Sequence, residues 1–236
     1  MKATKKPVLA VLTGAGMSAE SGISTFRGAG GLWEGHRIED VASPEGWYRN
    51  RNLVLHFYNL RRKNVMEAKP NAGHLILAEM EKDFDVRIVT QNVDDLHERA
   101  GSSQVMHIHG EIRKSRSTID PSLVYDINRV ELNEGDICEK GSQLRPHIVW
   151  FGEEVPLIGK AVEWISLADF FVVVGTSLLV YPAAGLIMVP GSNVKKFVID
   201  PEIPDVSAVQ NIELIPEKAS TGLVLLRNRL NTFCMA

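Results

Sequence analysis

The stretch Val11-Leu-Thr-Gly-Ala-Gly-Met-Ser-Ala-Glu-Ser-Gly-Ile23 decides which fold to expect. It continues a short apolar run and places Gly14, Gly16 and Ala19 at the spacing G-x-G-x-x-A. Small residues between a strand and a helix allow the backbone to approach a pyrophosphate closely. The same spacing also occurs where a strand simply meets a helix at short range. The turn therefore indicates a nucleotide-binding fold but does not specify the chemistry.

Short apolar runs that end in polar turns predict buried parallel strands. They occur at Pro7–Leu12, Val86–Thr90, Asp169–Val174 and Lys195–Ile199, with a weaker candidate at Ser103–Ile108. Helical patterns lie between them, at Ala72–Lys82, Asp94–Ala100 and Pro182–Met188. Because strands and helices alternate, we predict an α/β fold with a Rossmann-like parallel sheet and helices on both faces.

Two regions interrupt this alternation. The first contains aromatic residues and a helix expected at Asn52–Met66, and the second is polar. We interpret both as insertions that form a small module, residues 31–69 and 112–144, within a single catalytic domain of residues 1–236. The large Rossmann-like domain then consists of residues 1–30, 70–111 and 145–236.

Composition narrows the class of protein. With 236 residues, 44% of them hydrophobic, the chain is long enough for one sizeable core. A net charge of −3 argues against a nucleic-acid surface. No apolar run approaches the roughly 20 residues that span a bilayer, and the apolar stretch near the amino terminus is interpreted as the first strand and not as a signal peptide. We expect a cytoplasmic, monomeric protein with no membrane or nucleic-acid partner.

A dehydrogenase of this fold needs a second buried strand that ends in an acid about 20 residues after the glycine turn. The chain instead continues as Ser24-Thr-Phe-Arg-Gly-Ala-Gly-Gly-Leu-Trp33, which is a loop with a charged and an aromatic side chain. Glu39 and Asp40 lie in the right interval but follow no strand pattern. The sequence therefore argues against hydride transfer.

Polar segments follow three of the expected strands. They are Thr90-Gln-Asn-Val-Asp94, His107-Ile-His-Gly-Glu111 and Gly175-Thr-Ser177. Because the carboxyl ends of parallel strands form the ligand crevice, we expect these segments to meet there.

The motifs GAGMSAESGISTFRG, TQNVDDLHERAG, HIHGE, LRPHIVWFGE and GTSLLVYPAAG occur in this order along nearly the whole chain. Together they resemble the sirtuins, NAD-dependent protein-lysine deacylases. The resemblance implies a Rossmann-like domain with a small module, NAD as a consumed co-substrate, and acyl-lysine proteins as substrates.

The resemblance also implies the role of individual residues. Around the NAD phosphates and in the loop that closes over them it places Gly14, Ala15, Gly16, Glu20, Phe26 and Arg27. Around the nicotinamide and its ribose it places Gln91, Asn92 and Asp94, and on the adenosine side Gly175, Thr176, Ser177, Asp200 and Ala219. Asp200 stands where the family usually has asparagine; an ionised carboxylate accepts hydrogen bonds but cannot donate them.

In the sirtuin mechanism the acyl oxygen attacks the anomeric carbon of NAD, nicotinamide leaves and an alkylamidate forms. The resemblance makes His109 the base that takes a proton from a ribose hydroxyl, with Asn92 and Asp94 in the catalytic set. Histidine suits this role because its pKa lies near neutral pH. We expect five other histidines to be core residues, namely His56, His74, His97, His107 and His147.

The acyl pocket is expected on the helix around Tyr58 and Arg61, which are three residues apart and so share a face. The pattern Y-x-x-R resembles sirtuins that prefer succinyl- or malonyl-lysine, and a guanidinium with a phenol suits a carboxylate. An apolar stripe is expected at Leu53, Phe57 and Leu60. The channel is expected to be lined by Ala29, Val149, Phe151, Gly152, Glu153 and Val180.

Sirtuins usually hold a structural zinc ion with four cysteines between HGE and LRPH. This chain has only Cys138 there, and Ser117 stands where a first ligand is expected. One thiolate cannot complete tetrahedral coordination, so we expect no zinc. The module must then be held by apolar residues such as Leu123, Val124, Tyr125, Ile127, Val130 and Leu132.

Other functions use the same cofactor. A protein ADP-ribosyltransferase would activate NAD in the same way, and a non-catalytic sensor would bind NAD or ADP-ribose without needing His109. An oxidoreductase would change the absorbance of the nicotinamide.

Overall fold

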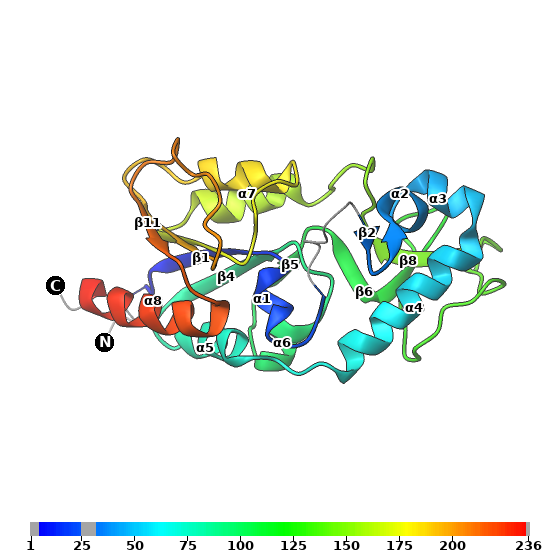
Figure 1. Cartoon of the computed structure of the whole chain (residues 1–236), viewed down its shortest axis with the longest axis horizontal. Coiled ribbons are helices and arrows are strands. Elements are labelled where there is room, and N and C mark those ends of the chain that lie inside the picture. Colours follow the sequence, from blue (N-terminus) through cyan, green and yellow to red (C-terminus); the bar gives the residue numbers. More distant parts are fainter. Residues whose placement is uncertain (1–4, 25–31, 235–236) are drawn as a thin grey trace.

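A computed structural model describes residues 5–24 and 32–234 and shows two lobes (Figure 1). The larger lobe contains a six-stranded parallel sheet with the order β11-β10-β9-β1-β4-β5. Its strands are β1 (Val8–Thr13), β4 (Asp85–Thr90), β5 (Val105–His107), β9 (Phe170–Val174), β10 (Lys195–Ile199) and β11 (Ile212–Ile215). Thr13 pairs with Thr90 on one side and with Val174 on the other. The glycine turn therefore begins at the centre of the carboxyl edge of the sheet.

Helices cover both faces of this sheet, as the alternation predicts (Figure 1). Leu9 and Val11 of β1 pack into one apolar cluster with the helices α5 (Ala72–Met80) and α8 (Ala219–Cys234). Ala10 and Leu12 pack into a second cluster with α7 (Ile158–Ser166) and the 3₁₀ helix Ala183–Met188. Two short helices complete the lobe, α1 (Gly16–Ala19) and α6 (Leu96–Ala100). The Rossmann-like α/β prediction is thus confirmed.

The smaller lobe combines helices with an antiparallel sheet of order β7-β6-β8. Its elements are α2 (Ile38–Val41), α3 (Pro44–Arg49), α4 (Arg51–Glu67), β6 (Gly110–Ser117), β7 (Val124–Asp126) and β8 (Leu144–Ile148), with a short hairpin of β2 (Leu32–Trp33) and β3 (His36–Arg37). They enclose a third apolar cluster, which includes Ile148 and Trp150. The expected domain division assigned these two residues to the large domain, and its boundaries stay a prediction.

Helix α4 buries a different face from the one expected. Leu60 is 48% exposed, so the stripe predicted through Leu53, Phe57 and Leu60 is wrong at its last member. The buried face instead contains Val54, Phe57, Tyr58, Arg61, Arg62 and Val65. These residues recur every three or four positions, so they lie on one side of the helix, where α4 contacts β6 and β8. Two arginines thereby point inward.

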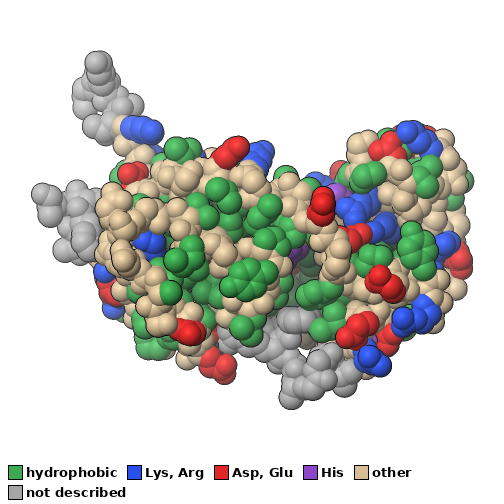
Figure 2. Space-filling model, turned by 90° about the horizontal axis from the view of Figure 1, so that it is seen from above, with side chains coloured by type: hydrophobic (Ala, Val, Ile, Leu, Met, Phe, Trp, Pro, Cys, Tyr) green, Lys and Arg blue, Asp and Glu red, His purple; other side chains and the backbone are tan. Residues whose placement is uncertain are grey.

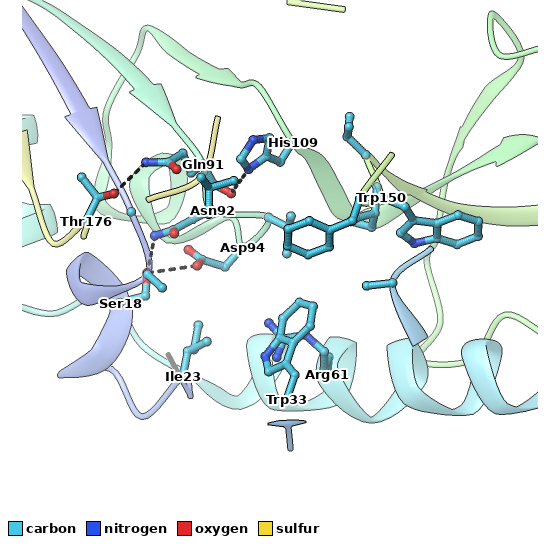
Figure 3. A pocket seen from close by; sticks show the side chains of 18 of the residues that line it. Ser18, Ile23, Trp33, Arg61, Gln91, Asn92, Asp94, His109, Trp150 and Thr176 are labelled. Carbon is cyan, nitrogen blue, oxygen red and sulfur yellow. Dashed lines mark hydrogen bonds between the residues drawn. The ribbon is translucent and has the colours of Figure 1, made fainter. Parts of the chain in front are cut away.

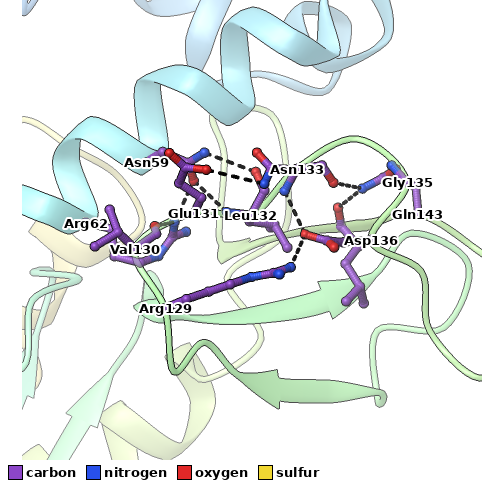
Figure 4. Close-up of polar contacts among 11 residues, drawn as sticks. Asn59, Arg62, Arg129, Val130, Glu131, Leu132, Asn133, Gly135, Asp136 and Gln143 are labelled. Atoms are coloured by element: carbon purple, nitrogen blue, oxygen red, sulfur yellow. Dashed lines mark hydrogen bonds and ion pairs between the residues drawn. The ribbon is translucent and has the colours of Figure 1, made fainter.

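One of these arginines, Arg62, connects α4 to the segment between β7 and β8 by a set of hydrogen bonds that we call the clasp (Figure 4). It is fully buried; its Nε donates to the carbonyl of Ile112 at 2.7 Å, and its Nη1 donates to the carbonyl of Val130 and to Asn59 Oδ1, both at 2.7 Å. Asn59 exchanges two hydrogen bonds with the backbone of Leu132, at 3.1 and 2.9 Å. Burial lowers the pKa of Arg62 to about 10, so it stays charged at neutral pH. The clasp supplies polar contacts between α4 and residues 130–132.

Further polar contacts form within the segment between β7 and β8 itself. Asp136 pairs with Arg129 and accepts from the backbone of Asn133, while Gln143 binds the backbone of Gly135 at 2.8 Å (Figure 4). Of the apolar residues expected to hold this segment, only Ile127 and Leu132 are buried. The expectation of a purely apolar support is therefore corrected, because the segment is too polar to form such a core.

Side-chain contacts connect two chain segments in the region where sirtuins usually carry zinc ligands. Cys138 Sγ lies 3.4 Å from Ser117 Oγ, and Lys140 donates to Asp120 at 2.7 Å. In the described ranges, no group of three or more His, Cys, Asp or Glu side chains could hold a metal ion. The contacts lie between the two segments, 117–122 and 137–142.

We predict that Arg62→Met lowers the free energy of unfolding by about 2–5 kcal/mol, because it leaves two buried carbonyls and Asn59 without their charged donor. Urea unfolding followed by circular dichroism measures this change. Lys63→Met, at the exposed neighbouring position, is the matched control and should change stability by less than about 0.5 kcal/mol. Equal effects of the two substitutions would show that the clasp contributes nothing.

We also predict that the purified protein holds no stoichiometric zinc and that EDTA leaves its thermal unfolding midpoint unchanged, because Cys138 alone cannot close a tetrahedral site. Elemental analysis with paired melting curves tests both points. About one tightly bound zinc ion per chain would contradict the prediction.

Candidate active site

A pocket lies at the carboxyl edge of the parallel sheet and extends toward the smaller lobe. Figure 2 shows the surface narrowing to a hollow between the two lobes, with hydrophobic side chains gathered beside it. The lining comes from the glycine turn, the segments after β4 and β9, helix α4 and the segment that follows β8. All three polar segments singled out in the sequence contribute residues to it, as the strand-end argument predicts.

The glycine turn is shaped by its contact with the turn after β9. Gly14 N donates to the carbonyl of Val174 at 3.0 Å, and Gly16 N donates to the carbonyl of Gly175 at 2.8 Å. A Cβ on Gly16 would lie 2.7 Å from the Cα of Gly175, which real Cβ atoms essentially never do. The small residues are therefore required for this close approach, and the amides of both glycines are already used within the protein.

A buried polar network connects the turn to the segment after β4 (Figure 3). Ser18 Oγ donates to Asp94 Oδ2 at 3.0 Å and accepts from Asn92 Nδ2 at 3.1 Å. Burial raises the pKa of Asp94, although the bonds from Ser18 and from the backbone of Leu96 oppose that rise. Ser18 was not anticipated as a site residue, although it lies within the quoted motif. It fixes the orientation of both the amide and the carboxylate.

The histidine expected to act as base is oriented by the same segment (Figure 3). His109 Nδ1 lies 3.2 Å from the backbone carbonyl of Gln91. Because a carbonyl can only accept, Nδ1 must carry the proton, which leaves the Nε2 lone pair free to accept one. Burial lowers the pKa of His109 below its ordinary value of 6.5, while the Gln91 carbonyl opposes this. The Gln91 side chain donates to Thr176 Oγ1 at 3.1 Å and so connects this segment to the turn after β9.

The neighbouring histidine has a different environment. His107 is buried, with Nδ1 2.9 Å from the carbonyl of Asn92 and Nε2 2.8 Å from Glu98 Oε1. Burial alone would lower the pKa of His107, but these two partners raise it overall. Both ring nitrogens are engaged, so His107 is a satisfied core residue, as predicted, that holds the backbone at Asn92.

Of the remaining histidines, His74 and His97 are buried side by side, with ring centroids 4.8 Å apart, and burial lowers the pKa of His74 to about 4. His147 is half-buried. His56 is exposed on α4, because it points away from the buried face of that helix; its assignment to the core was wrong.

At the smaller-lobe end of the pocket, α4 presents Tyr58 and Arg61 together. The Tyr58 hydroxyl accepts from Trp150 Nε1 at 3.0 Å, and burial raises the pKa of Tyr58 to about 12. The Arg61 guanidinium stacks 4.1 Å from the ring centroid of Trp33 and donates through Nη1 to Glu34 Oε1 at 3.0 Å. Sequence reasoning did not anticipate Trp33, Glu34 or Trp150 here.

The residues expected along the acyl channel fall into three groups. Val149, Phe151, Gly152 and Val180 line the pocket. Glu153 also lines it, but its carboxylate accepts from Arg145 at 2.6 and 3.1 Å and from the backbone of Trp150 at 2.8 Å, which fixes the loop after β8. Ala29, together with Phe26 and Arg27 of the expected closing loop, lies outside the described residues.

Three residues expected to contact NAD lie outside the pocket lining. Glu20 accepts from Ser220 N and Oγ at 3.0 and 2.8 Å, next to the buried Ala219 at the start of α8. Asp200 is buried just after β10 and accepts from the backbone of Glu202 at 2.9 Å. Their contacts with NAD stay predictions, whereas Gly14, Ala15, Gly16, Gln91, Asn92, Asp94, His109, Gly175, Thr176 and Ser177 are brought together around one pocket.

A Rossmann-like sheet whose carboxyl edge carries a pocket lined by His109 and by amide and carboxylate side chains is the kind of site that nucleotide-dependent enzymes use. Residues 14–182 match the Sir2 family. The chain therefore belongs to the Sir2 family, and it is an NAD-dependent protein deacylase that uses NAD as co-substrate.

Proteins that match this chain over nearly its full length carry the same family function in their names. The chain is 52% identical, over 94% of its length and 97% of the relative's, to an NAD-dependent protein deacylase of Bacteroides thetaiotaomicron. It is 53% identical to one of Helicobacter pylori strain J99, over 89% and 90% of the two chains. Among solved structures it is similar to a Sir2 homologue in complex with NAD, with 36% identity, a TM-score of 0.85 and coverage of 96% and 90%.

The environment of His109 predicts how activity depends on pH. A base works while neutral, and because its pKa is lowered, His109 stays neutral below pH 6.5. We expect kcat/KM for deacylation to hold down to pH 6.5 and to fall with an acid midpoint below that value. His109→Ala should lower kcat roughly 10²–10⁴-fold while NAD binding, measured by calorimetry, survives. An acid midpoint above 6.5, or undiminished turnover by the variant, would contradict the assignment.

Proposed function

We propose that this deacylase acts on lysines that carry acidic acyl groups, succinyl or malonyl, and on acetyl-lysine more weakly. The observation that carries the proposal is the placement of Tyr58 and Arg61, both buried, on the wall of the same pocket as His109. A carboxylate that leaves water for this pocket needs a fixed cation to receive it.

The hydrogen-bond inventory of this pair supports a carboxylate ligand. The Tyr58 hydroxyl accepts from Trp150, so its own proton is available to donate, and its raised pKa keeps that proton in place. Arg61 Nε is buried and, within the described part of the chain, has no hydrogen-bond partner. Two donors one helical turn apart are therefore ready for an acceptor, and a distal carboxylate would satisfy both.

The polar side chains at the large-lobe end of the pocket are of the kinds that bind NAD. Amide, carboxylate and hydroxyl side chains of Gln91, Asn92, Asp94, Thr176 and Ser18 surround this end of the pocket, and these groups bind ribose hydroxyls and a carboxamide. NAD supplies an anomeric carbon from which nicotinamide departs. We assign Asn92 and Asp94 to holding the reacting ribose, and the turns at Gly14–Gly16 and Gly175–Ser177 to the phosphates and the adenosine.

His109 then supplies the base. Its Nε2 lone pair takes the proton of a ribose hydroxyl, so that the hydroxyl oxygen can attack the acyl carbon, and the Gln91 carbonyl holds the tautomer that this requires. The products are free lysine, nicotinamide and O-acyl-ADP-ribose.

This chain exposes apolar side chains beside the pocket, where a protein substrate can bind. Leu179, Tyr181 and Phe151 are exposed, and Phe151 and Tyr181 also line the pocket. We assign these residues to holding the substrate chain on both sides of the acyl-lysine. We keep a monomeric state, a cytoplasmic location and the lack of nucleic-acid binding as proposals. In the described residues, no helix has the length and apolar character needed to cross a bilayer.

Arg61→Met tests the acyl preference. Removing the guanidinium leaves the distal carboxylate buried without its cation, which costs about 2–5 kcal/mol, or at least about 25-fold in kcat/KM. Acetyl-lysine turnover should fall far less, since methionine keeps much of the volume. The measurement compares kcat/KM for succinyl- and acetyl-lysine peptides of one sequence, with Lys63→Met as the control on the same helix. Equal proportional losses for the two acyl groups would assign Arg61 a structural role and remove the proposed preference.

A further inference from the structure

The cation proposed to receive the acyl carboxylate already has a carboxylate partner within the chain. Arg61 Nη1 donates to Glu34 Oε1 at 3.0 Å. Glu34 comes from the hairpin of β2 and β3, which is 27 residues away in the chain from Arg61. The Trp33 ring stacks against the same guanidinium (Figure 3). The hairpin therefore covers Arg61 with both an aromatic face and a negative charge.

The turn that presents Glu34 adopts a conformation that glutamate rarely takes. Strands β2 and β3 pair Trp33 with His36, which leaves Glu34 and Gly35 as a two-residue turn with φ values of 50° and 82°. Such turns favour asparagine, aspartate or glycine at both positions. The carboxylate is thus held near Arg61 by a strained turn residue.

The two partners differ in how far they are withdrawn from water. The Arg61 side chain is 7% exposed and the Glu34 side chain is 26% exposed. Arg61 belongs to the pocket wall, whereas the Glu34 carboxylate keeps partial contact with water. Glu34 accepts from Nη1, and Arg61 Nε remains without a partner among the described residues.

We propose that Glu34 is an internal competitor for Arg61 that sets the selectivity between acidic and neutral acyl groups. The proposal rests on the acyl pocket of the proposed function. A succinyl or malonyl carboxylate that binds at Arg61 Nε competes with Glu34 for the single positive charge of a buried guanidinium, because the two carboxylates repel each other. An acetyl group carries no charge and leaves the pair intact. Glu34 therefore lowers the turnover of acidic acyl groups and leaves that of acetyl groups nearly unchanged.

Removing the charge of Glu34 tests this directly. We expect Glu34→Gln to raise the ratio of succinyl to acetyl kcat/KM about tenfold, mainly through a lower KM for the succinyl peptide, in line with a partly exposed ion pair. Glu34→Asn removes the same charge with a residue suited to the turn, so it serves if the glutamine variant melts below the assay temperature. Glu39→Gln, an exposed acid that pairs with Arg37 on the same segment, is the matched charge control and should leave the ratio unchanged.

The Arg61→Met background separates the two proposals. There, Glu34→Gln should no longer change the ratio, since nothing remains to compete for. A ratio that stays constant or falls in both Glu34 variants would overturn the competitor role, and a fall would mean that Glu34 orients Arg61 for the substrate. If Arg61→Met lowers both acyl classes equally, the acyl pocket itself fails; if it is selective while the Glu34 variants are not, only the role of Glu34 fails.

Discussion

The contact between two glycine turns determines where everything else in the site can lie. Gly175 has a φ of 64°, and a Cβ on it would lie 2.3 Å from the backbone nitrogen of Met17. Only the absence of side chains lets the turns after β1 and β9 meet, and Gly175 N extends the connection to β10 through the carbonyl of Ile199 at 2.9 Å. The strand ends are thereby locked into one edge, and the segment after β4 joins them through the bond from Gln91 to Thr176.

From that edge the chain passes into the smaller lobe at His109. The next residue, Gly110, has a φ of 86°, and a Cβ there would lie 2.1 Å from the carbonyl of His147. Val149 N donates to the carbonyl of His109 at 2.9 Å, so the base lies where β6 and the segment after β8 converge. Helix α4 is attached to β6 by Arg62. The acyl end of the pocket and the base are thus held by the same small sheet.

The sequence predicts the repetitive parts of this arrangement. Continuous apolar runs predict most of the central strands. Polar residues at the ends of these strands predict that Asn92, Asp94 and His109 meet, and all three line one pocket. The strand Ile212–Ile215 was missed because it is short and carries Glu213 in an edge strand. Helix α8 was missed because it opens on Ala-Ser-Thr-Gly, although Leu223, Leu226 and Leu230 lie on one buried face. Glu34 and Arg62 give no local signal at all, since their roles depend on partners 27 and 50 or more residues away.

The central claim is that one pocket brings together NAD, an acidic acyl-lysine and the neutral His109 base. Mass spectrometry of the wild-type reaction tests it most directly, with NAD and an equimolar mixture of succinyl-, malonyl- and acetyl-lysine peptides of one sequence. The account predicts one nicotinamide and one O-acyl-ADP-ribose for each lysine released, with O-succinyl- and O-malonyl-ADP-ribose exceeding the acetyl product. Reduced nicotinamide, ADP-ribose attached to the peptide, or only the acetyl product would contradict it.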